Sequence, residues 1–216
     1  AYIDDLRNKN FMLECAVLQE QFDLARILLS HHADIETVDS TGVSLLQKTV
    51  RANKKRAVEF LLEAGAGVNK PDNAGKTALH EAVQGNFIEL GEILLSHGAD
   101  MNLKMRHDVH GECAPLHWAI LNDHIECVRM LLQSPSIMSL SQNDIKKAFL
   151  FAIHNSRASI PMILQSQLFK TKGLEVVHQV ELLDDAIMRN DYDMFYKLLY
   201  DACDASCLDM LSHKNE

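Results

Sequence analysis

The chain has 216 residues, 47% of them hydrophobic and 6% aromatic, and a formal net charge of −9. That composition is ordinary for a folded protein, no apolar run approaches the roughly 18 residues of a membrane helix, and the negative charge argues against binding nucleic acid or a membrane surface. Five cysteines without paired spacing favour free thiols in a reducing compartment, the cytoplasm or nucleus. No signal peptide is visible, and the abrupt opening leads us to expect a piece of a longer protein.

The chain begins with two ranges in which apolar side chains recur at helical spacing. Residues 1–7 are predicted to be a lead-in or the end of a preceding element. Residues 8–37 then hold two short apolar stripes, and residues 39–70 hold two more. Apolar residues three and four apart line one face of a helix, so each range is predicted to form a pair of short helices.

The clearest unit covers residues 72–102. It opens with the turn sequence Asp-Asn-Ala-Gly, in which Gly75 permits a positive φ. Thr77 can cap the helix that follows, and Gly98 stands where the second helix needs a left-handed residue. Two short helices cannot bury their apolar faces alone, so similar units are expected on either side.

The pattern continues downstream and then weakens. Residues 103–135 form another unit with an enlarged turn at 104–113, a position where insertions often serve binding. Residues 141–216 keep only apolar helical spacing. They are predicted to form two degenerate units and a short capping helix, as expected at the end of a stack. The alternative is a small separate helical domain over the same residues.

A fixed period relates these units. Leu61 and Leu94 stand 33 residues apart, and the next step is 37 because of the enlarged turn. A period near 33, with a turn and two helices in each period, is typical of ankyrin repeats. The segments GKTALH at 75–80 and APLH at 114–117 resemble the family's G-x-TPLH motif, and LLSHGADMN at 94–102 resembles its LLxxGADVN ending.

This resemblance to the ankyrin-repeat family implies an all-α solenoid of stacked helix–turn–helix units joined by β-hairpin-like turns. About six repeats are expected, the last two degenerate. Four of them fall in residues 1–140, in the ranges 8–37, 39–70, 72–102 and 103–135. The family binds other proteins through a concave groove, so the chain is expected to be a non-catalytic interaction module, monomeric and without a cofactor.

The resemblance also implies which residues meet the partner. These are the exposed positions of the turns and of the first helix in each repeat. They are Ser40, Thr41, Val43 and Arg51 in the second repeat, Asn73, Ala74, Lys76 and Gln84 in the third, and Arg106, His107, Leu121 and Asn122 in the fourth.

The turn face is basic although the chain as a whole is acidic. The residues that make it so are Lys70, Lys76, Lys104 and Arg106. Their charge favours an acidic or phosphorylated segment of a partner protein. The alternative is that they only keep exposed turns soluble.

No catalytic or metal site is predicted. His80 and His117 stand at the histidine of the TPLH motif, where the family's side chain hydrogen-bonds the backbone of a neighbouring turn. Cys113 lies four residues before His117, but Pro115 begins a helix between them and no third group orients the pair. Neither a metal-ligand spacing nor a phosphate-binding glycine loop occurs.

Two asparagines are candidates for modification. Asn69 and Asn102 each end a repeat, in a context that resembles the one used by the asparaginyl hydroxylase of ankyrin repeats. Asp100 precedes Asn102 by two residues, whereas Gly67 precedes Asn69, which weakens that match. The alternative is that both side chains close the turn by hydrogen bonding.

Other functions stay open at this level. The chain could be the scaffold or substrate-recruiting region of a larger enzyme, or of a microbial effector acting in host cells. Residues 141–216 could also carry an activity that no motif identifies. The sequence names neither the partner nor the pathway.

Overall fold

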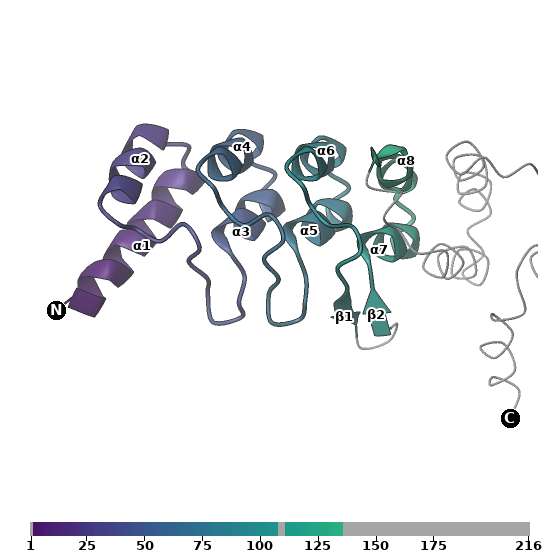
Figure 1. Ribbon diagram of the computed structural model, residues 1–216, viewed down its shortest axis with the longest axis horizontal. Coiled ribbons are helices and arrows are strands. Elements are labelled where there is room, and N and C mark those ends of the chain that lie inside the picture. The colour runs from purple at the N-terminus through teal and green to yellow at the C-terminus, as the bar shows by residue number, and fades with distance from the viewer. Residues whose placement is uncertain (1, 108–110, 136–216) are drawn as a thin grey trace, which may run out of the picture. The chain divides into compact units, whose positions relative to one another are not determined.

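The computed structural model describes the backbone of residues 2–107 and 111–135, and the side chains from Asn8 onward. These residues belong to the first of two compact units, Ala1–Ile160. Within them, eight helices form four successive pairs, with one two-stranded sheet (Figure 1). The predicted all-α stack of helix pairs is confirmed. The two degenerate repeats, the capping helix and the alternative domain were all predicted for 141–216, which lies outside the described residues.

The helices alternate between an inner row beside the turns and an outer row (Figure 1). The inner helices are α1 (Tyr2–Leu18), α3 (Leu45–Arg51), α5 (Ala78–Gln84) and α7 (Pro115–Leu121). The outer helices are α2 (Phe22–Ser30), α4 (Lys55–Glu63), α6 (Ile88–Ser96) and α8 (Ile125–Gln133). Two strands, β1 (Met105–His107) and β2 (Gly111–Cys113), build the enlarged turn. Each inner helix packs on the next, and so do α4, α6 and α8, which makes one continuous stack.

Polar caps start two of the inner helices. The backbone N–H of Gln47 donates to the Ser44 hydroxyl at 3.3 Å, and the Ser44 N–H donates to the Gln47 side chain at 2.8 Å. This reciprocal arrangement is a capping box, which satisfies two of the unpaired N–H groups at a helix start. Thr77 occupies the same position before α5, as predicted, and its N–H donates to Nδ1 of His80 at 3.2 Å.

Left-handed residues end and join the helices. Asn53, Asn86 and Asp123 have φ values of 52°, 54° and 59° between the two helices of their repeats. Asparagine and aspartate tolerate this conformation better than other residues with a side chain. Gly98 has a φ of 84° just after α6, where the sequence predicted a left-handed residue.

Leucines at the repeat spacing form the core. Leu28, Leu61, Leu94 and Leu131 are all buried. Aromatic contacts are few, but the rings of Phe22 and Phe60 stack across the first two pairs with centroids 4.9 Å apart. Small and aliphatic side chains therefore fill a thin core, as in a solenoid whose units contact their neighbours.

The first helix is longer than expected. α1 begins at Tyr2, whereas the first pair of helices was predicted within residues 8–37, after residues 1–7. The physical reason is that the turn residues of the other repeats are missing here. Leu6 and Lys9 stand one period before Asp39 and Gly42, so nothing interrupts the helix. Among the helices described above, none combines the length and apolar character that crossing a bilayer requires.

Candidate functional site

The candidate site is the inner face, which we define as the surface formed by the turns and by the exposed side of α3, α5 and α7. Aspartates build its turns. Oδ1 of Asp39 accepts hydrogen bonds from the Thr41 hydroxyl at 2.6 Å and from the N–H groups of Thr41 and Val43 at 2.9 and 3.1 Å. The Thr41 hydroxyl bond is the largest cause of the lowered pKa of Asp39. Asp72 accepts equivalent bonds from the N–H groups of Ala74 and Lys76.

Neighbouring turns are joined by backbone hydrogen bonds. The N–H of Asn73 donates to the Thr41 carbonyl at 3.1 Å, and the N–H of Arg106 donates to the Ala74 carbonyl at 2.8 Å. The approach is close, because a Cβ on Gly75 would lie 2.8 Å from the Lys104 carbonyl oxygen. The turns of three repeats are therefore held as one row.

The enlarged turn of the fourth repeat is a β-hairpin (Figure 1). Its antiparallel pairs are Met105 with Cys113, Arg106 with Glu112, and His107 with Gly111. The centroids of the His107 and Trp118 rings are 5.2 Å apart, and this contact connects the hairpin to α7. The predicted four-residue insertion thus extends the row of turns.

A buried carboxylate organises the centre of the inner face. The Glu81 side chain is only 4% exposed, and its Oε1 accepts from Arg51 Nη2 at 2.5 Å and lies 3.0 Å from Lys76 Nζ. Lys76 also donates to the Gln84 side chain. Burial alone would raise the pKa of Glu81, but the hydrogen bonds from Arg51 and Lys76 outweigh it and the pKa is lowered. The hydrogen bond between Arg51 and Glu81 also raises the pKa of the Arg51 guanidinium.

Other cations on this side of the molecule also have acidic neighbours. Lys48 Nζ lies 2.9 Å from Glu14 and 3.8 Å from Asp39. Lys70 Nζ lies 3.1 Å from the carboxylate of Glu36 and donates to its backbone carbonyl at 2.6 Å. The basic turn face predicted from the sequence is thus largely neutralised at Lys70, and at Lys76 by Glu81.

The predicted contact residues divide by exposure. Ser40, Thr41, Arg51, Asn73, Ala74, Gln84, Arg106 and Asn122 are exposed, while Lys76, His107 and Leu121 are partly exposed. Val43 was predicted to be exposed, and this is wrong, because its side chain is only 5% exposed. It lies at the base of the turn directly before Ser44, the cap of α3, where its apolar side chain packs into the stack.

A second row of bonds ties α3 and α5 to the turn of the next repeat. Nε2 of Gln47 donates to the Lys76 carbonyl at 2.6 Å, and Nε2 of His80 lies 3.1 Å from the Cys113 carbonyl. Because Nδ1 of His80 accepts from the Thr77 N–H, Nε2 carries the proton and donates. Burial lowers the pKa of His80 to about 4, so the ring is neutral at pH 7. The bond from His80 to the neighbouring turn, implied by the resemblance, is present.

The two modification candidates are both engaged. Asn69 donates from Nδ2 to the Gly98 carbonyl at 3.0 Å and accepts at Oδ1 from the Asp100 N–H at 2.7 Å. Asn102 donates from its backbone and its side chain to Oδ1 of Asp100, at 2.8 and 3.0 Å. Asn69 therefore joins two repeats, and Asn102 bonds within its own turn.

Neither a metal-binding cluster nor an activated thiol at Cys113 or Cys127 occurs among the described residues. They contain no group of three or more His, Cys, Asp or Glu side chains placed to hold a metal ion. Burial raises the pKa of the Cys113 thiol, and raises that of Cys127 to about 11. Thiols with such pKa values are protonated at pH 7 and are weak nucleophiles.

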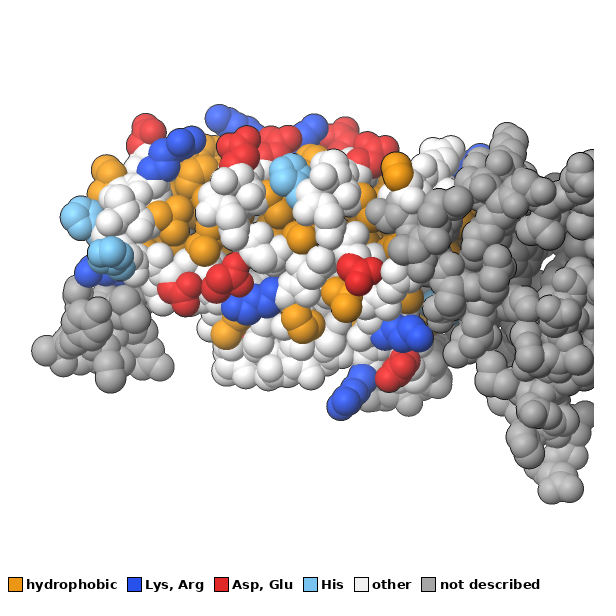
Figure 2. Space-filling view, viewed as in Figure 1, with side chains coloured by type: hydrophobic (Ala, Val, Ile, Leu, Met, Phe, Trp, Pro, Cys, Tyr) orange, Lys and Arg blue, Asp and Glu red, His pale blue; other side chains and the backbone are white. Residues whose placement is uncertain are grey.

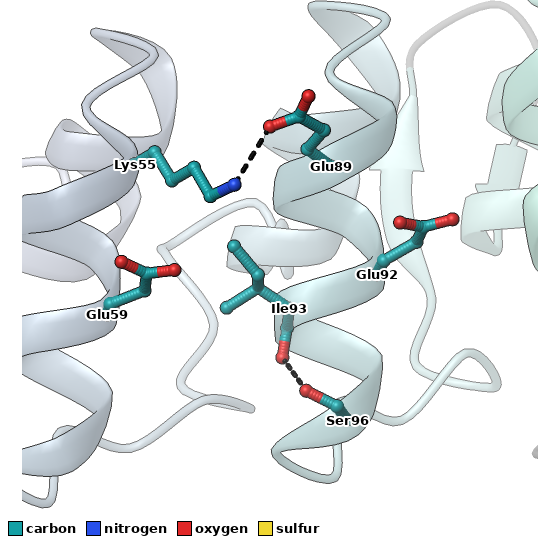
Figure 3. Close-up of a pocket in the computed structure, with 6 residues that line it drawn as sticks. All are labelled: Lys55, Glu59, Glu89, Glu92, Ile93 and Ser96. Carbon is teal, nitrogen blue, oxygen red and sulfur yellow. Dashed lines mark hydrogen bonds and ion pairs between the residues drawn. The ribbon is translucent and has the colours of Figure 1, made fainter.

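A hollow that the sequence did not indicate lies on the opposite side, between α4 and α6 (Figure 3). Its lining residues are Lys55, Glu59, Glu89, Glu92, Ile93 and Ser96. Lys55 Nζ lies 3.0 Å from Glu89, and their hydrogen bond raises the pKa of the lysine. Acidic and basic side chains lie together along this outer row (Figure 2). The hollow is a charged surface between exposed helices, without convergent buried groups.

Comparison with known families agrees with this architecture. A family model described as Ankyrin repeats, in three copies, matches residues 11–105, and one described as Ankyrin repeat matches residues 112–141. Together they cover more than half of the chain, which belongs to the ankyrin-repeat family. No curated protein sequence matches it. Ankyrin repeats are generally protein–protein interaction modules and typically non-catalytic.

Proposed function

We propose that this chain binds a partner protein through the inner face and is itself non-catalytic. The observation that carries the proposal is the fixed row of turns. Hydrogen bonds from Asn73 to Thr41 and from Arg106 to Ala74 hold the exposed turn residues of three repeats in one array. A surface held in place before binding loses less conformational entropy when a partner docks.

The partner segment is acidic or phosphorylated in this proposal. Arg51 supports it, because its side chain is 56% exposed and its guanidinium carries five N–H donors, one of which is bonded to Glu81. Arg106 supports it from the exposed hairpin. Arginine binds carboxylate and phosphate groups through paired hydrogen bonds. Lys76 is a weaker contributor than its sequence position suggested, because Glu81 and Gln84 already engage its ammonium group.

The test is quantitative affinity capture from cell lysate. Arg106→Glu reverses an exposed charge on the hairpin, and Arg129→Glu reverses an exposed charge on α8 of the outer row as the matched control. We expect a captured protein to be lost with Arg106→Glu, by about tenfold or more, and kept with Arg129→Glu. A protein that is kept with Arg106→Glu and lost with Arg129→Glu would place binding on the outer row.

Asn102 is the better of the two candidates for hydroxylation. Asp100 precedes it by two residues, whereas Gly67 stands at that place before Asn69, and the Asn69 side chain is bonded to Gly98 and Asp100 of the next repeat. Incubation with an ankyrin asparaginyl hydroxylase followed by peptide mass spectrometry should add one oxygen atom at Asn102. Addition at Asn69 alone would contradict this assignment.

A reducing compartment, the cytoplasm or nucleus, is also proposed. In the part of the chain that the structure describes, it is supported by Cys15, Cys113 and Cys127, none of which is in a disulfide and of which the last two are buried. Buried free thiols are usual where disulfides do not form.

A further inference from the structure

The inner face changes in chemical character from one repeat to the next. Two positions, one helical turn apart, show this on α3, α5 and α7. The residues at the first position are Lys48, Glu81 and Trp118, and those at the second are Arg51, Gln84 and Leu121. The second position is exposed on α3 and α5 and partly exposed on α7. It carries a cation, then a neutral amide, then an aliphatic side chain.

The α3 end of this surface carries one net positive charge. Glu81 Oε1 lies 2.5 Å from Arg51 Nη2 and 3.0 Å from Lys76 Nζ, so two cations share one carboxylate. The Lys76 side chain is only 15% exposed, whereas the Arg51 side chain is 56% exposed. Arg51 is therefore the cation that a partner reaches, and its guanidinium has donors beyond the one that Glu81 accepts.

A single carboxylate is the anion that matches this end. One negative charge balances the net charge, and the planar guanidinium fits a carboxylate through paired hydrogen bonds. A phosphate group carries nearly two negative charges at pH 7. The hydrogen bond to Glu81 is the main cause of the raised pKa of Arg51, and the carboxylates of Asp39 and Asp72 add to it. These acids would repel the second charge of a phosphate.

The α7 end is apolar and aromatic. Trp118 and Leu121 lie one turn apart on α7, and both are partly exposed. The His107 ring of the hairpin is also partly exposed, and its centroid is 5.2 Å from that of the Trp118 ring. This contact restrains the indole before binding, so less side-chain entropy is lost when an apolar group packs on it. Tryptophan is a frequent anchor residue in protein interfaces.

The separation of the two ends sets the length of segment that reaches both. The helices α3, α5 and α7 follow one another in the inner row, and each packs on the next (Figure 1). Packed helices lie about 8–10 Å apart, so α3 and α7 are roughly 16–20 Å apart. An extended chain advances about 3.3 Å per residue. About five or six positions therefore separate two residues of the segment that contact the two ends.

We propose that the inner face binds an extended segment of a partner protein, with an Asp or Glu and a large apolar residue about five or six positions apart. The carboxylate pairs with Arg51, and the apolar side chain packs on Trp118 and Leu121. This inference rests on the proposed function and adds to it the chemistry and spacing of the bound segment.

The test is selection of random peptides of about 12 residues, displayed on phage, against the full chain, long enough to span both ends. Fluorescence polarisation then measures the affinity of the selected peptides. Two substitutions exchange the chemistry of the ends, Arg51→Leu on α3 and Leu121→Arg on α7. Arg129→Leu, at an exposed arginine of α8 in the outer row, is the matched control. Circular dichroism melting of all variants checks that the fold is retained.

We expect the wild-type chain to select peptides with an acidic and a large apolar residue at the stated spacing. Arg51→Leu should weaken these peptides at least about tenfold and select apolar residues at both ends. Leu121→Arg should select acidic residues at both ends, and Arg129→Leu should bind the wild-type peptides unchanged. Replacing the acidic residue of a selected peptide by phosphoserine should not tighten its binding, and tighter binding would overturn the assignment of a carboxylate.

Other outcomes separate this inference from the proposed function. Selected peptides that lack the apolar residue or a fixed spacing, or a wild-type chain that selects none, overturn the inference. The proposed function still stands in those cases if Arg106→Glu abolishes capture of a protein from lysate. Peptides that bind equally to Arg51→Leu, Leu121→Arg and Arg106→Glu but are lost with Arg129→Leu would overturn both.

Discussion

At the scale of single residues, His80 shows how one side chain joins two repeats. It accepts from Thr77 at one ring nitrogen and donates to the Cys113 carbonyl with the other. Gln47 makes the equivalent bond one repeat earlier, because an amide can also accept and donate at once. Glu14 stands at the same position in the first repeat. An ionised carboxylate cannot donate to a carbonyl, and Glu14 instead pairs with Lys48.

This comparison predicts the effect of changing His80. His80→Ala leaves buried polar groups unpaired and should lower the free energy of unfolding by about 1–3 kcal/mol. His80→Gln can keep both bonds, as Gln47 does, and should lower it by less than half as much. Urea denaturation followed by circular dichroism measures both. Equal losses in the two variants would show that the ring contributes packing rather than hydrogen bonds.

His80 also predicts a dependence on pH. Its pKa is about 4 in the folded chain, lowered from 6.5 by burial. The unfolded chain therefore binds the extra proton first, and the free energy of unfolding falls as the pH drops from about 6.5 to about 4. The full contribution is on the order of 3 kcal/mol and is present above pH 6.5. The advantage of wild type over His80→Gln in unfolding free energy should therefore shrink and then reverse as the pH falls through this range, because glutamine does not titrate. A constant difference would contradict the neutral, buried histidine.

His32 is a residue whose backbone does not suit its side chain. Its φ is 66°, and the equivalent residues, Gly65 and Gly98, are glycines with φ values of 92° and 84°. A left-handed conformation costs a residue with a side chain roughly 1 kcal/mol more than glycine. His32→Gly should therefore raise the free energy of unfolding by about that amount in urea denaturation. Asn53→Gly is the control, and it should change little because asparagine tolerates a positive φ.

At the scale of elements, the close approach of neighbouring turns is the main constraint. Gly75 and Gly98 both have a φ of 84°, but a Cβ on Gly75 would meet the Lys104 carbonyl at 2.8 Å, whereas nothing lies within 4 Å of one on Gly98. Gly98→Ala should cost about 1 kcal/mol from its backbone conformation alone. Gly75→Ala should cost more, by roughly 1–3 kcal/mol, because the turns must also separate. Thermal or urea unfolding of both variants measures these losses of stability. Equal losses would mean that the neighbouring turns can separate at no cost in free energy.

The network around Glu81 joins α3 to α5 at the same scale. Glu81→Gln keeps the size of the side chain but leaves Arg51 and Lys76 without a negative partner, and should lower the free energy of unfolding by about 1–3 kcal/mol. Glu89→Gln removes the exposed partner of Lys55 and should change the free energy of unfolding far less, because solvent screens an exposed ion pair. Urea denaturation at low and high salt distinguishes the buried Glu81 network from the exposed Lys55–Glu89 pair, because salt screens an exposed pair more strongly. An equally small change in the free energy of unfolding for both variants would show that the Glu81 network does not stabilise the fold.

At the scale of the whole molecule, the inner face proposed for binding arises from the repeat geometry. The inner face exists because the turns of the second, third and fourth repeats bond to one another, and among the described residues no helix pair lies over the end formed by α1 and α2. A solenoid buries each unit against its neighbours, so its exposed end keeps the apolar side chains of an internal joint.

The sequence by itself determined the features that depend on neighbours along the chain. The leucine period predicted the helix pairs. Thr77 marked the start of one helix and Gly98 the end of another, and the insertion after Asn102 predicted the enlarged turn. These are local because caps, turns and helical stripes involve residues a few positions apart.

Only the tertiary structure decided what depends on residues brought together by stacking. Glu81 lies 30 residues from Arg51 in the sequence, and their pairing comes from the register of two repeats. Val43 is buried because the turn closes over the core, and Phe11 is exposed because nothing described packs on α1 from that side. Burial and ion pairing are properties of the assembled stack, and a pattern read along one repeat does not contain them.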